Sequence, residues 1–221
     1  MTHEEILQGL YDNTLIGNAP EVRDLTNAGL EADLDPEKML YDALIPSLEE
    51  VGARFERGDF FVPEMLIAAR AMQGALDILR PLLAETGAKP IGTYVMGTVK
   101  GDVHDIGKNL VNIMLEGAGF DVHDLGVNVA PEKFIEAIQD HQPDIVGFSA
   151  FLTTTMPMFK ANINALEKAG VRGEVIVMVG GAPVTQEYAD AVGADGYAAD
   201  ASSAVRLAKD LIARKRSAVP A

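Results

Sequence analysis

Apolar residues recur at helical intervals through about the first 86 positions, and no run there is typical of a strand. The segment Asn18-Ala19-Pro20 interrupts this pattern and puts a proline where a second helix can begin. Such helices, joined by short loops, favour a four-helix bundle. The expected helices begin near Glu5, cover Glu21–Ala32, run from Pro36 to about Phe55, and run from Pro63 through Leu79.

The pattern changes after the polar segment Glu85–Pro90, where short apolar runs typical of buried strands alternate with helical stretches. Such strand-then-helix units build a parallel sheet with helices on both faces. We therefore predict an α/β protein, with a four-helix bundle over residues 1–88, a five-stranded parallel domain over 89–216 and a tail over 217–221. The expected strands are Ile91–Val99, Phe120–Leu125, Asp144–Ser149, Val175–Val179 and Gly196–Ala199, and the expected helices between and after them are Ile106–Glu116, Pro131–Asp140, Met156–Lys168, Thr185–Val192 and Ser202–Arg214.

Composition and charge exclude several classes of protein. The formal net charge of −15 would repel a phosphate backbone, and no basic stretch interleaved with aromatic residues offsets it, so we expect no nucleic-acid partner. No apolar segment reaches the length of a membrane span, and we expect no membrane contact. The absence of cysteine excludes disulfides and thiolate metal sites. Because the acidic N-terminus also lacks the features of a signal peptide, we expect a cytoplasmic protein.

A histidine lies in the turn after the first expected strand. The segment Gly101–Asn109 stands between an apolar run and a helical pattern, and ligands of α/β sheets bind in such turns. Asp102 precedes His104 by two residues, and a metal-ligating imidazole generally donates its other N–H to a carboxylate or carbonyl. A lone loop histidine is more often a capping or surface residue. The spacing Asp-x-His-x-x-Gly, which ends at Gly107, favours a ligand site here.

Two other turns at the carboxyl ends of expected strands are rich in small or hydroxyl-bearing residues. Gly147–Thr155 carries Ser149 and the run Thr153–Thr155, which could bond a polar ligand or serve as ordinary turn and cap residues. Gly180-Gly181 stands in the next such turn, where a tight backbone is the other explanation. Small residues, Gly147 among them, would leave room beside the sheet. A long, narrow ligand could enter that space.

The segment Thr98–Asn109 resembles the corrinoid-binding motif of cobalamin-dependent methyltransferases and mutases, in its methyltransferase version. From about Glu5 to Leu211 the chain is similar to the corrinoid proteins of methylamine, methanol and methoxy-compound methyltransferase systems, and to the cobalamin-binding region of methionine synthase. The resemblance implies a flavodoxin-like (Rossmann-type) domain that binds cobalamin with its nucleotide tail beside the sheet. By this match His104 is the lower ligand of cobalt, Asp102 is its hydrogen-bond partner, and Thr155 completes the relay.

The resemblance also assigns further contacts to the cofactor. Ser149 matches the serine that faces the nucleotide base, and Gly180-Gly181 borders the tail pocket, whereas Phe151 stands where the family has leucine. The loop Phe55–Glu64 matches the loop of a helical cap over the cofactor, and core packing of the bundle is the other explanation for its apolar side chains. The implied cofactor-binding residues are Asp102, Val103, His104, Asp105, Ile106, Gly107, Ser149, Phe151, Leu152, Thr153, Thr155, Gly180, Gly181, Phe55, Phe61 and Val62, with His104 as the metal ligand.

The activity implied by the resemblance is that of a methyl carrier, one subunit of a methyltransferase system. A chain of this size holds no barrel that could activate a methyl donor, so a donor-specific barrel methyltransferase is an expected partner. A second methyltransferase, acting on coenzyme M or tetrahydrofolate, and a reductive activator are the others. The polar segment Glu85–Pro90 would let the cap move aside for each partner.

Three other classes share parts of this pattern. A response regulator has the same architecture, but it needs an acceptor aspartate where this chain has Ser149. A cobalamin-based sensor or binding module shares the capped fold, but it typically adds a cap tryptophan and a DNA-binding domain. A non-haem metal hydrolase could use His104 and Asp102 together with His123 or Asp124. The flanks of the histidine motif favour the methyl carrier over all three.

Overall fold

The computed structural model describes residues 1–86 and 89–218, which form two compact units. One unit runs from Met1 to Lys89 and includes Glu116–Gly119, and the other contains the rest of the described chain. Residues 87–88 of the predicted linker and residues 219–221 of the predicted tail lie outside the described residues. Over the described ranges, no helix is long and apolar enough to cross a membrane.

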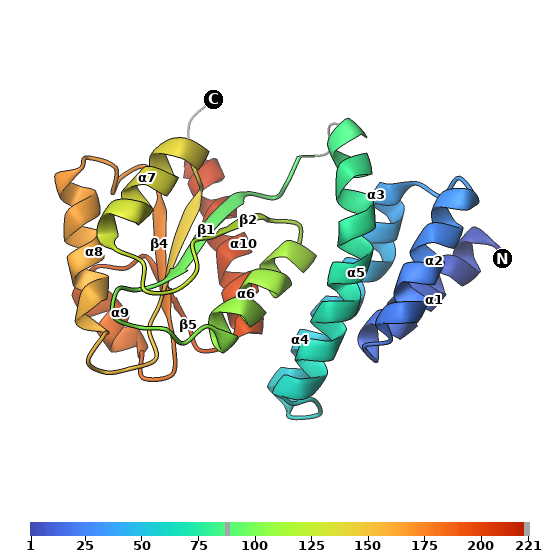
Figure 1. Cartoon of the computed structure of the whole chain (residues 1–221), viewed down its shortest axis with the longest axis horizontal. Helices are drawn as coiled ribbons and strands as arrows, with labels where there is room; N and C mark the ends of the chain where they lie inside the picture. The colour runs from blue at the N-terminus through green and yellow to red at the C-terminus, as the bar shows by residue number, and fades with distance from the viewer. Residues whose placement is uncertain (87–88, 219–221) are drawn as a thin grey trace. The chain divides into compact units, whose positions relative to one another are not determined.

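The first unit is helical, as predicted (Figure 1). Thr2 begins it with a capping box, in which its side chain accepts from the Glu5 N–H and the Glu5 carboxylate accepts from the Thr2 N–H. The third predicted helix contains a π-helical segment just before Pro46, where the Ile45 N–H bonds to the Leu40 carbonyl. A proline ring clashes with the carbonyl four residues earlier, and the wider π turn accommodates it. The segments are α1 (His3–Leu15), α2 (Ala19–Glu31), α3 (Pro36–Lys38), η1 (Met39–Leu44), α4 (Ile45–Arg57) and α5 (Val62–Thr86).

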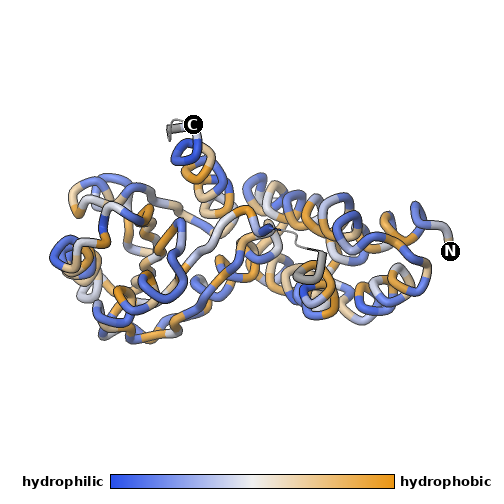
Figure 2. Tube along the Cα trace, turned by 90° about the horizontal axis from the view of Figure 1, so that it is seen from above, coloured by the Kyte–Doolittle hydropathy of each residue, from blue (hydrophilic) through white to orange (hydrophobic). Residues whose placement is uncertain are grey.

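Apolar side chains on the inner faces of these helices make the core of the first unit. Hydrophobic and hydrophilic residues alternate along each helix in Figure 2, as an amphipathic helix requires. α4 ends at Gly58, whose φ of 79° is the left-handed conformation that glycine adopts without a Cβ penalty. The largest fully buried side chains of this unit are Ile6, Leu10, Met39, Leu44, Met65, Met72 and Leu79.

The second unit is a five-stranded sheet in the order β2-β1-β3-β4-β5, and every neighbouring pair is parallel. This flavodoxin-like order confirms the predicted fold class. All the predicted strands and helices of this unit are present, with ends that differ by a few residues. The strands are β1 (Thr93–Thr98), β2 (Asp121–Asp124), β3 (Ile145–Ser149), β4 (Ile176–Gly180) and β5 (Gly196–Ala198), and the helices are α6 (Ile106–Gly117), α7 (Pro131–His141), α8 (Pro157–Lys168), α9 (Gln186–Val192) and α10 (Ala201–Ala218).

Helices cover both faces of the sheet (Figure 1). α7, α8 and α9 lie on the face where Val95, Val146 and Val177 make a buried core with them. α6 and α10 lie on the other face, where Gly196 of β5 leaves room for side chains of α10. Because both faces are covered, the central strands are apolar on both sides, which explains the continuous apolar runs in the sequence.

The order of the strands places a topological switch point between β1 and β3. The chain leaves β1 toward β2 on one side and returns to β3 on the other side, and ligands of such sheets bind at the carboxyl edge near this point. The register pairs Thr98 with Ser149 and Ser149 with Gly180, so the three predicted ligand-binding turns begin side by side.

Candidate functional site

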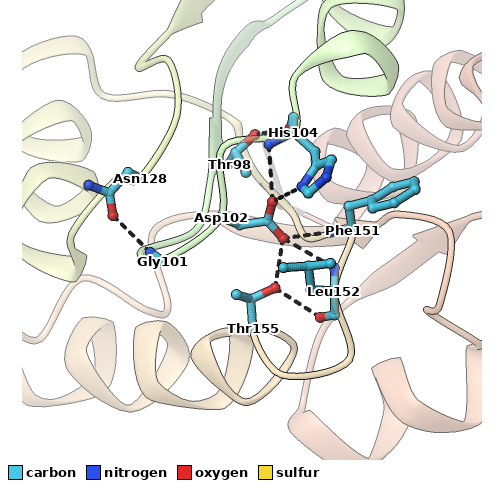
Figure 3. A network of polar contacts seen from close by, with 8 residues as sticks. All are labelled: Thr98, Gly101, Asp102, His104, Asn128, Phe151, Leu152 and Thr155. Carbon is cyan, nitrogen blue, oxygen red and sulfur yellow. Dashed lines mark hydrogen bonds and ion pairs between the residues drawn. The ribbon is translucent and has the colours of Figure 1, made fainter.

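Asp102 is the centre of a hydrogen-bond network at this edge of the sheet (Figure 3). Its side chain is fully buried, and its Oδ1 lies 2.7 Å from His104 Nδ1 and accepts from the His104 backbone N–H at 3.1 Å. Its Oδ2 accepts from Thr155 Oγ1 at 2.7 Å and from the backbone N–H groups of Phe151 at 2.8 Å and Leu152 at 3.2 Å. The β1–α6 and β3–α8 loops therefore meet at one carboxylate, and the three predicted relay residues lie together.

These contacts decide the charge of Asp102. Burial by itself raises the pKa of this carboxyl. Hydrogen bonds from the Thr155 hydroxyl, the His104 ring and backbone, and the Phe151 N–H act in the opposite direction and outweigh burial, so the pKa lies well below its ordinary value. Asp102 is therefore ionised at neutral pH and can act only as an acceptor.

The ionised Asp102 fixes the tautomer and direction of the His104 ring. Because Asp102 only accepts, the hydrogen between them belongs to Nδ1, and the lone pair of a neutral imidazole is left on Nε2. The His104 side chain is 45% exposed, so Nε2 is accessible to a ligand. The Phe151 ring stacks on the imidazole, with 4.4 Å between centroids and 24° between planes. This is the arrangement of a histidine prepared to bind a metal.

Two residues outside the predicted site hold the backbone of this loop. Thr98 Oγ1 donates to the His104 carbonyl at 3.0 Å. Asn128, in the β2–α7 loop, accepts from the Gly101 N–H through Oδ1 at 2.8 Å and donates its own N–H to the Asp102 carbonyl at 2.9 Å. Sequence reasoning missed Asn128. The available signal was its place in a third loop at the same sheet edge, where asparagine tolerates left-handed backbone.

Gly147, within β3, and Gly181, just after β4, have different surroundings. Gly181 has a φ of 132°, and a Cβ there would collide with the Ala150 carbonyl, so the two strand ends approach closely only because this residue is glycine. Gly147 does not leave an open space, contrary to the prediction. The side chains of Tyr94 and Met96 occupy the volume beside it, because β1 presents them on the same face.

Several predicted contact residues expose large apolar side chains around the histidine. An exposed apolar cluster on a polar surface marks a binding site more often than an isolated exposed residue does. Asp105, in contrast, accepts from the Asn109 side chain and so supports the first turn of α6, and Gly107 has open space around it. The exposed apolar residues of these loops are Val103, Ile106, Phe151 and Leu152.

The predicted cap residues belong to the helical unit. Phe55 is half-buried near the end of α4, Phe61 immediately precedes α5, and Val62 is its first residue. Phe61 and Val62 are exposed, so core packing does not explain them.

Lys108, in the first turn of α6 just after the histidine motif, links this helix to β2. Its side chain is buried, and its Nζ donates to Asp124 Oδ2 at 2.5 Å and to Asn109 Oδ1 at 2.7 Å. His123 stacks on His141 instead of facing His104. In the described part of the chain, no three histidine or carboxylate side chains converge as a metal site would require, so the geometry does not support the hydrolase alternative.

Comparisons with known proteins identify the class. The family described as B12 binding domain matches residues 92–206, and a second family with the same description matches residues 6–80. The chain belongs to this B12-binding family, and within it to the corrinoid proteins. The dimethylamine corrinoid protein of Methanosarcina barkeri is 43% identical over 215 residues, which cover 96% of this chain and all of that protein.

Two further matches support the same assignment. Trimethylamine corrinoid protein 2 of Methanosarcina acetivorans is 41% identical over 211 residues, 95% of this chain and 97% of that protein. The structure of the methanol:cobalamin methyltransferase complex of Methanosarcina barkeri aligns with a TM-score of 0.82 at 30% identity, over 95% of this chain and 80% of that one. These matches confirm the resemblance, the fold and cobalamin as the cofactor.

The residues present fit a corrinoid. The lone pair of His104 Nε2 is a suitable ligand for cobalt, and the carboxylate on Nδ1 supplies the partner that ligating histidines usually have. The exposed side chains of Val103, Ile106 and Leu152 offer apolar contact to a macrocycle. Gly180 and Gly181 leave the carboxyl end of β4 free of side chains.

Proposed function

We propose that this protein is a corrinoid methyl carrier in which His104 Nε2 is the lower axial ligand of cobalt. When bound, the corrinoid supplies a cobalt centre that accepts a methyl group and passes it on. The observation that carries the proposal is the network in which buried Asp102 bonds to His104 Nδ1 and leaves Nε2 accessible. The family assignment supports the same role.

Each relay residue has a separate task. Asp102 keeps the hydrogen of the imidazole on Nδ1 and increases the donor strength of Nε2. Thr155 holds the other carboxylate oxygen. Its single hydroxyl hydrogen has two acceptors within reach, Asp102 Oδ2 at 2.7 Å and the Leu152 carbonyl at 2.8 Å. A proton placed on Asp102 Oδ2 could be donated to the Thr155 hydroxyl, which would then donate to the Leu152 carbonyl.

The methyl donor is proposed from the relatives. Their names specify dimethylamine and trimethylamine, and the dimethylamine corrinoid protein matches 96% of this chain at 43% identity, against 95% at 41% for the trimethylamine protein. We therefore propose a methylamine, with dimethylamine first. Methyltransferases specific for mono-, di- and trimethylamine, each mixed with its own amine and the reduced holo-protein, test this choice. Methylation from dimethylamine at the highest rate is expected, and equal or faster methylation from another donor would contradict it.

The expected partners follow from the carrier role. We propose a donor-specific barrel methyltransferase, a second methyltransferase that transfers to coenzyme M or tetrahydrofolate, and a reductive activator. We also propose that Phe61 and Val62, with Phe55 behind them, contact the corrinoid. The cysteine-free composition is compatible with the reducing cytoplasm, where we propose that the carrier works.

The axial ligand is tested by an absorption spectrum. The protein is refolded with hydroxocobalamin, desalted, and compared with His104→Gly and with the control His123→Gly. We expect cofactor retention and a histidine-ligated spectrum in the wild type and in His123→Gly, and a changed spectrum only in His104→Gly. Identical spectra for the wild type and His104→Gly would refute His104 as the ligand, and colourless wild-type protein would refute the carrier itself.

A further inference from the structure

Asn128 contacts the loop that presents His104 at two consecutive residues. Its side-chain Oδ1 accepts from the Gly101 N–H at 2.8 Å (Figure 3). Its backbone N–H donates to the Asp102 carbonyl at 2.9 Å. The two bonds enclose the Gly101–Asp102 dipeptide. They come from the β2–α7 loop, a part of the chain that contributes none of the predicted cofactor contacts.

The backbone on both sides of these bonds is in the left-handed region. Asn128 has a φ of 54° and Gly101 has a φ of 85°. Asparagine adopts this conformation more readily than most residues with a Cβ, and glycine adopts it freely. The Val99–Val129 bridge and the bond from the Val129 N–H to the Thr98 carbonyl hold the two loops parallel just beside this point. The side chain of Asn128 therefore acts on a backbone that its neighbours have already brought within reach.

We infer that Asn128 is a positioning residue for the axial histidine, an inference that rests on the proposed role of His104. Fixing Gly101 and Asp102 fixes where the Asp102 carboxylate begins, and that carboxylate orients the imidazole through Nδ1. Asn128 has no direct contact with the ring. Loss of its Oδ1 leaves the Gly101 N–H without this acceptor and lets the Asp102 carboxylate shift, which weakens the hold on His104.

Two substitutions at this position separate the acceptor from the backbone. Asn128→Gly keeps the left-handed φ and the N–H that bonds to Asp102, but it removes the side-chain oxygen. Asn128→Asp keeps an oxygen acceptor at the same place and also tolerates a positive φ. If the Oδ1 acceptor positions His104, the binding of His104 to cobalt weakens in Asn128→Gly and is kept in Asn128→Asp. A role limited to backbone conformation predicts the reverse, because glycine is the better residue there.

The test uses the full chain loaded with cobalamin and reduced by one electron to the Co(II) form. Electron paramagnetic resonance then reports an axial nitrogen, because ¹⁴N splits each cobalt line into three, and ¹⁵N-labelled protein, which gives two lines, distinguishes histidine from the benzimidazole of the cofactor. We expect this splitting in the wild type and in Asn128→Asp. In Asn128→Gly we expect the ratio of unligated to ligated cobalt to rise about fivefold, the factor that one ordinary hydrogen bond is worth. Protection of the Gly101 amide from hydrogen exchange in the wild type is a second measurement that needs no variant.

The outcomes distinguish this inference from the proposed function. Absence of nitrogen splitting in the wild type refutes His104 as the ligand and the inference with it. Splitting that disappears in His104→Gly but is unchanged in Asn128→Gly overturns the inference alone. A loss in Asn128→Asp equal to that in Asn128→Gly also overturns it, because the acceptor would then not be the cause. Fast exchange of the Gly101 amide would contradict it even if the glycine variant failed to fold.

Discussion

Two six-residue segments of this protein have almost the same sequence and entirely different environments. Asp102–Gly107 and Asp121–Gly126 both read Asp-Val-His-Asp-x-Gly, with isoleucine at the fifth place of the first and leucine at the fifth place of the second. Both contain the Asp-x-His-x-x-Gly spacing. The first segment is the loop after β1 and the start of α6, and the second contains all of β2 and the turn that follows. Nothing within the six residues distinguishes a site from a strand.

The two aspartates show the difference most clearly. Asp102 is fully buried and bonds to His104 Nδ1 at 2.7 Å, whereas Asp121 is 54% exposed and lies 3.2 Å from His123 Nε2. In β2 the two residues share one face of an edge strand, because strand side chains alternate. In the first segment the carboxylate is instead buried against the β3–α8 loop, which supplies its donors.

The β3–α8 loop, a third segment of the chain, decides which of the two aspartates becomes part of a site. Phe151 and Thr155 stand about 50 residues beyond Asp102 in the chain, and they reach it because β3 lies next to β1. His123 instead stacks on the ring of His141, at a centroid distance of 3.9 Å. A site forms only where donors converge on the carboxylate.

The largest expected effect concerns the two aspartates. In cofactor-free full-length protein, Asp102→Asn should lower the free energy of unfolding by about 3 kcal/mol, because the amide NH₂ would face other donors in a buried place. Asp121→Asn should cost less than about 0.5 kcal/mol, because that pair is exposed. Urea denaturation followed by circular dichroism measures both. Similar losses for the two variants would show that buried Asp102 contributes no more to stability than exposed Asp121.

Acid should affect the two segments unequally. The pKa of Asp102 is lowered in the folded protein, so its contribution to stability is complete above the unfolded value of about 4 and is lost as the pH falls below it. About 2 kcal/mol of the difference between wild type and Asp102→Asn should disappear on acidification. Urea midpoints at a series of pH values from neutral to acidic test this, with Asp121→Asn as the control. A difference that stays constant with pH would mean that folding does not lower the pKa of Asp102.

A smaller effect is expected for the hydroxyl that bonds to Asp102. Thr155→Val keeps the shape of the side chain but removes its donor, and it should cost about 1.5 kcal/mol because the lost bond is to a charged group. Thr153→Val, at an exposed position two residues earlier, should be nearly neutral. Thermal denaturation of the two variants in parallel gives the comparison. If Thr153→Val is the more damaging change, the assignment of the relay hydroxyl is wrong.

The smallest effect belongs to the second histidine. His123→Ala removes a partly exposed ring and its stacking on His141, and we expect a cost of about 0.5 kcal/mol. The amount of hydroxocobalamin retained after desalting should equal that of the wild type. A clear fall in retention would show that this second segment also serves the cofactor.

Much of the fold could be predicted because its signals are local or periodic. The strands β1, β3 and β4 are apolar runs bounded by turn residues, and the four helices of the first unit alternate with short polar loops. The π turn before Pro46 was not predicted, because it is a short change of hydrogen bonding within a helix that continues on both sides. Gly147 was assigned to an open space, but its neighbours in β1 fill that space.

The site was only partly predictable, because several of its contacts join residues that are far apart in the sequence. Asp102, His104 and Thr155 were named from a resemblance that includes long flanks, and the structure brings them together. Asn128 was not named, because its contact with Gly101 spans 27 positions and has no motif of its own. The burial of Lys108 likewise depends on Asp124 of the neighbouring strand.

Residues close in the chain set the order and type of the elements, the two regions of different periodicity and the Asp-x-His-x-x-Gly motif. The physical difference between the two nearly identical segments comes from the tertiary fold. Burial and hydrogen bonding of a carboxylate require groups from distant parts of the chain, and the parallel sheet alone brings those groups to Asp102 and leaves Asp121 in water.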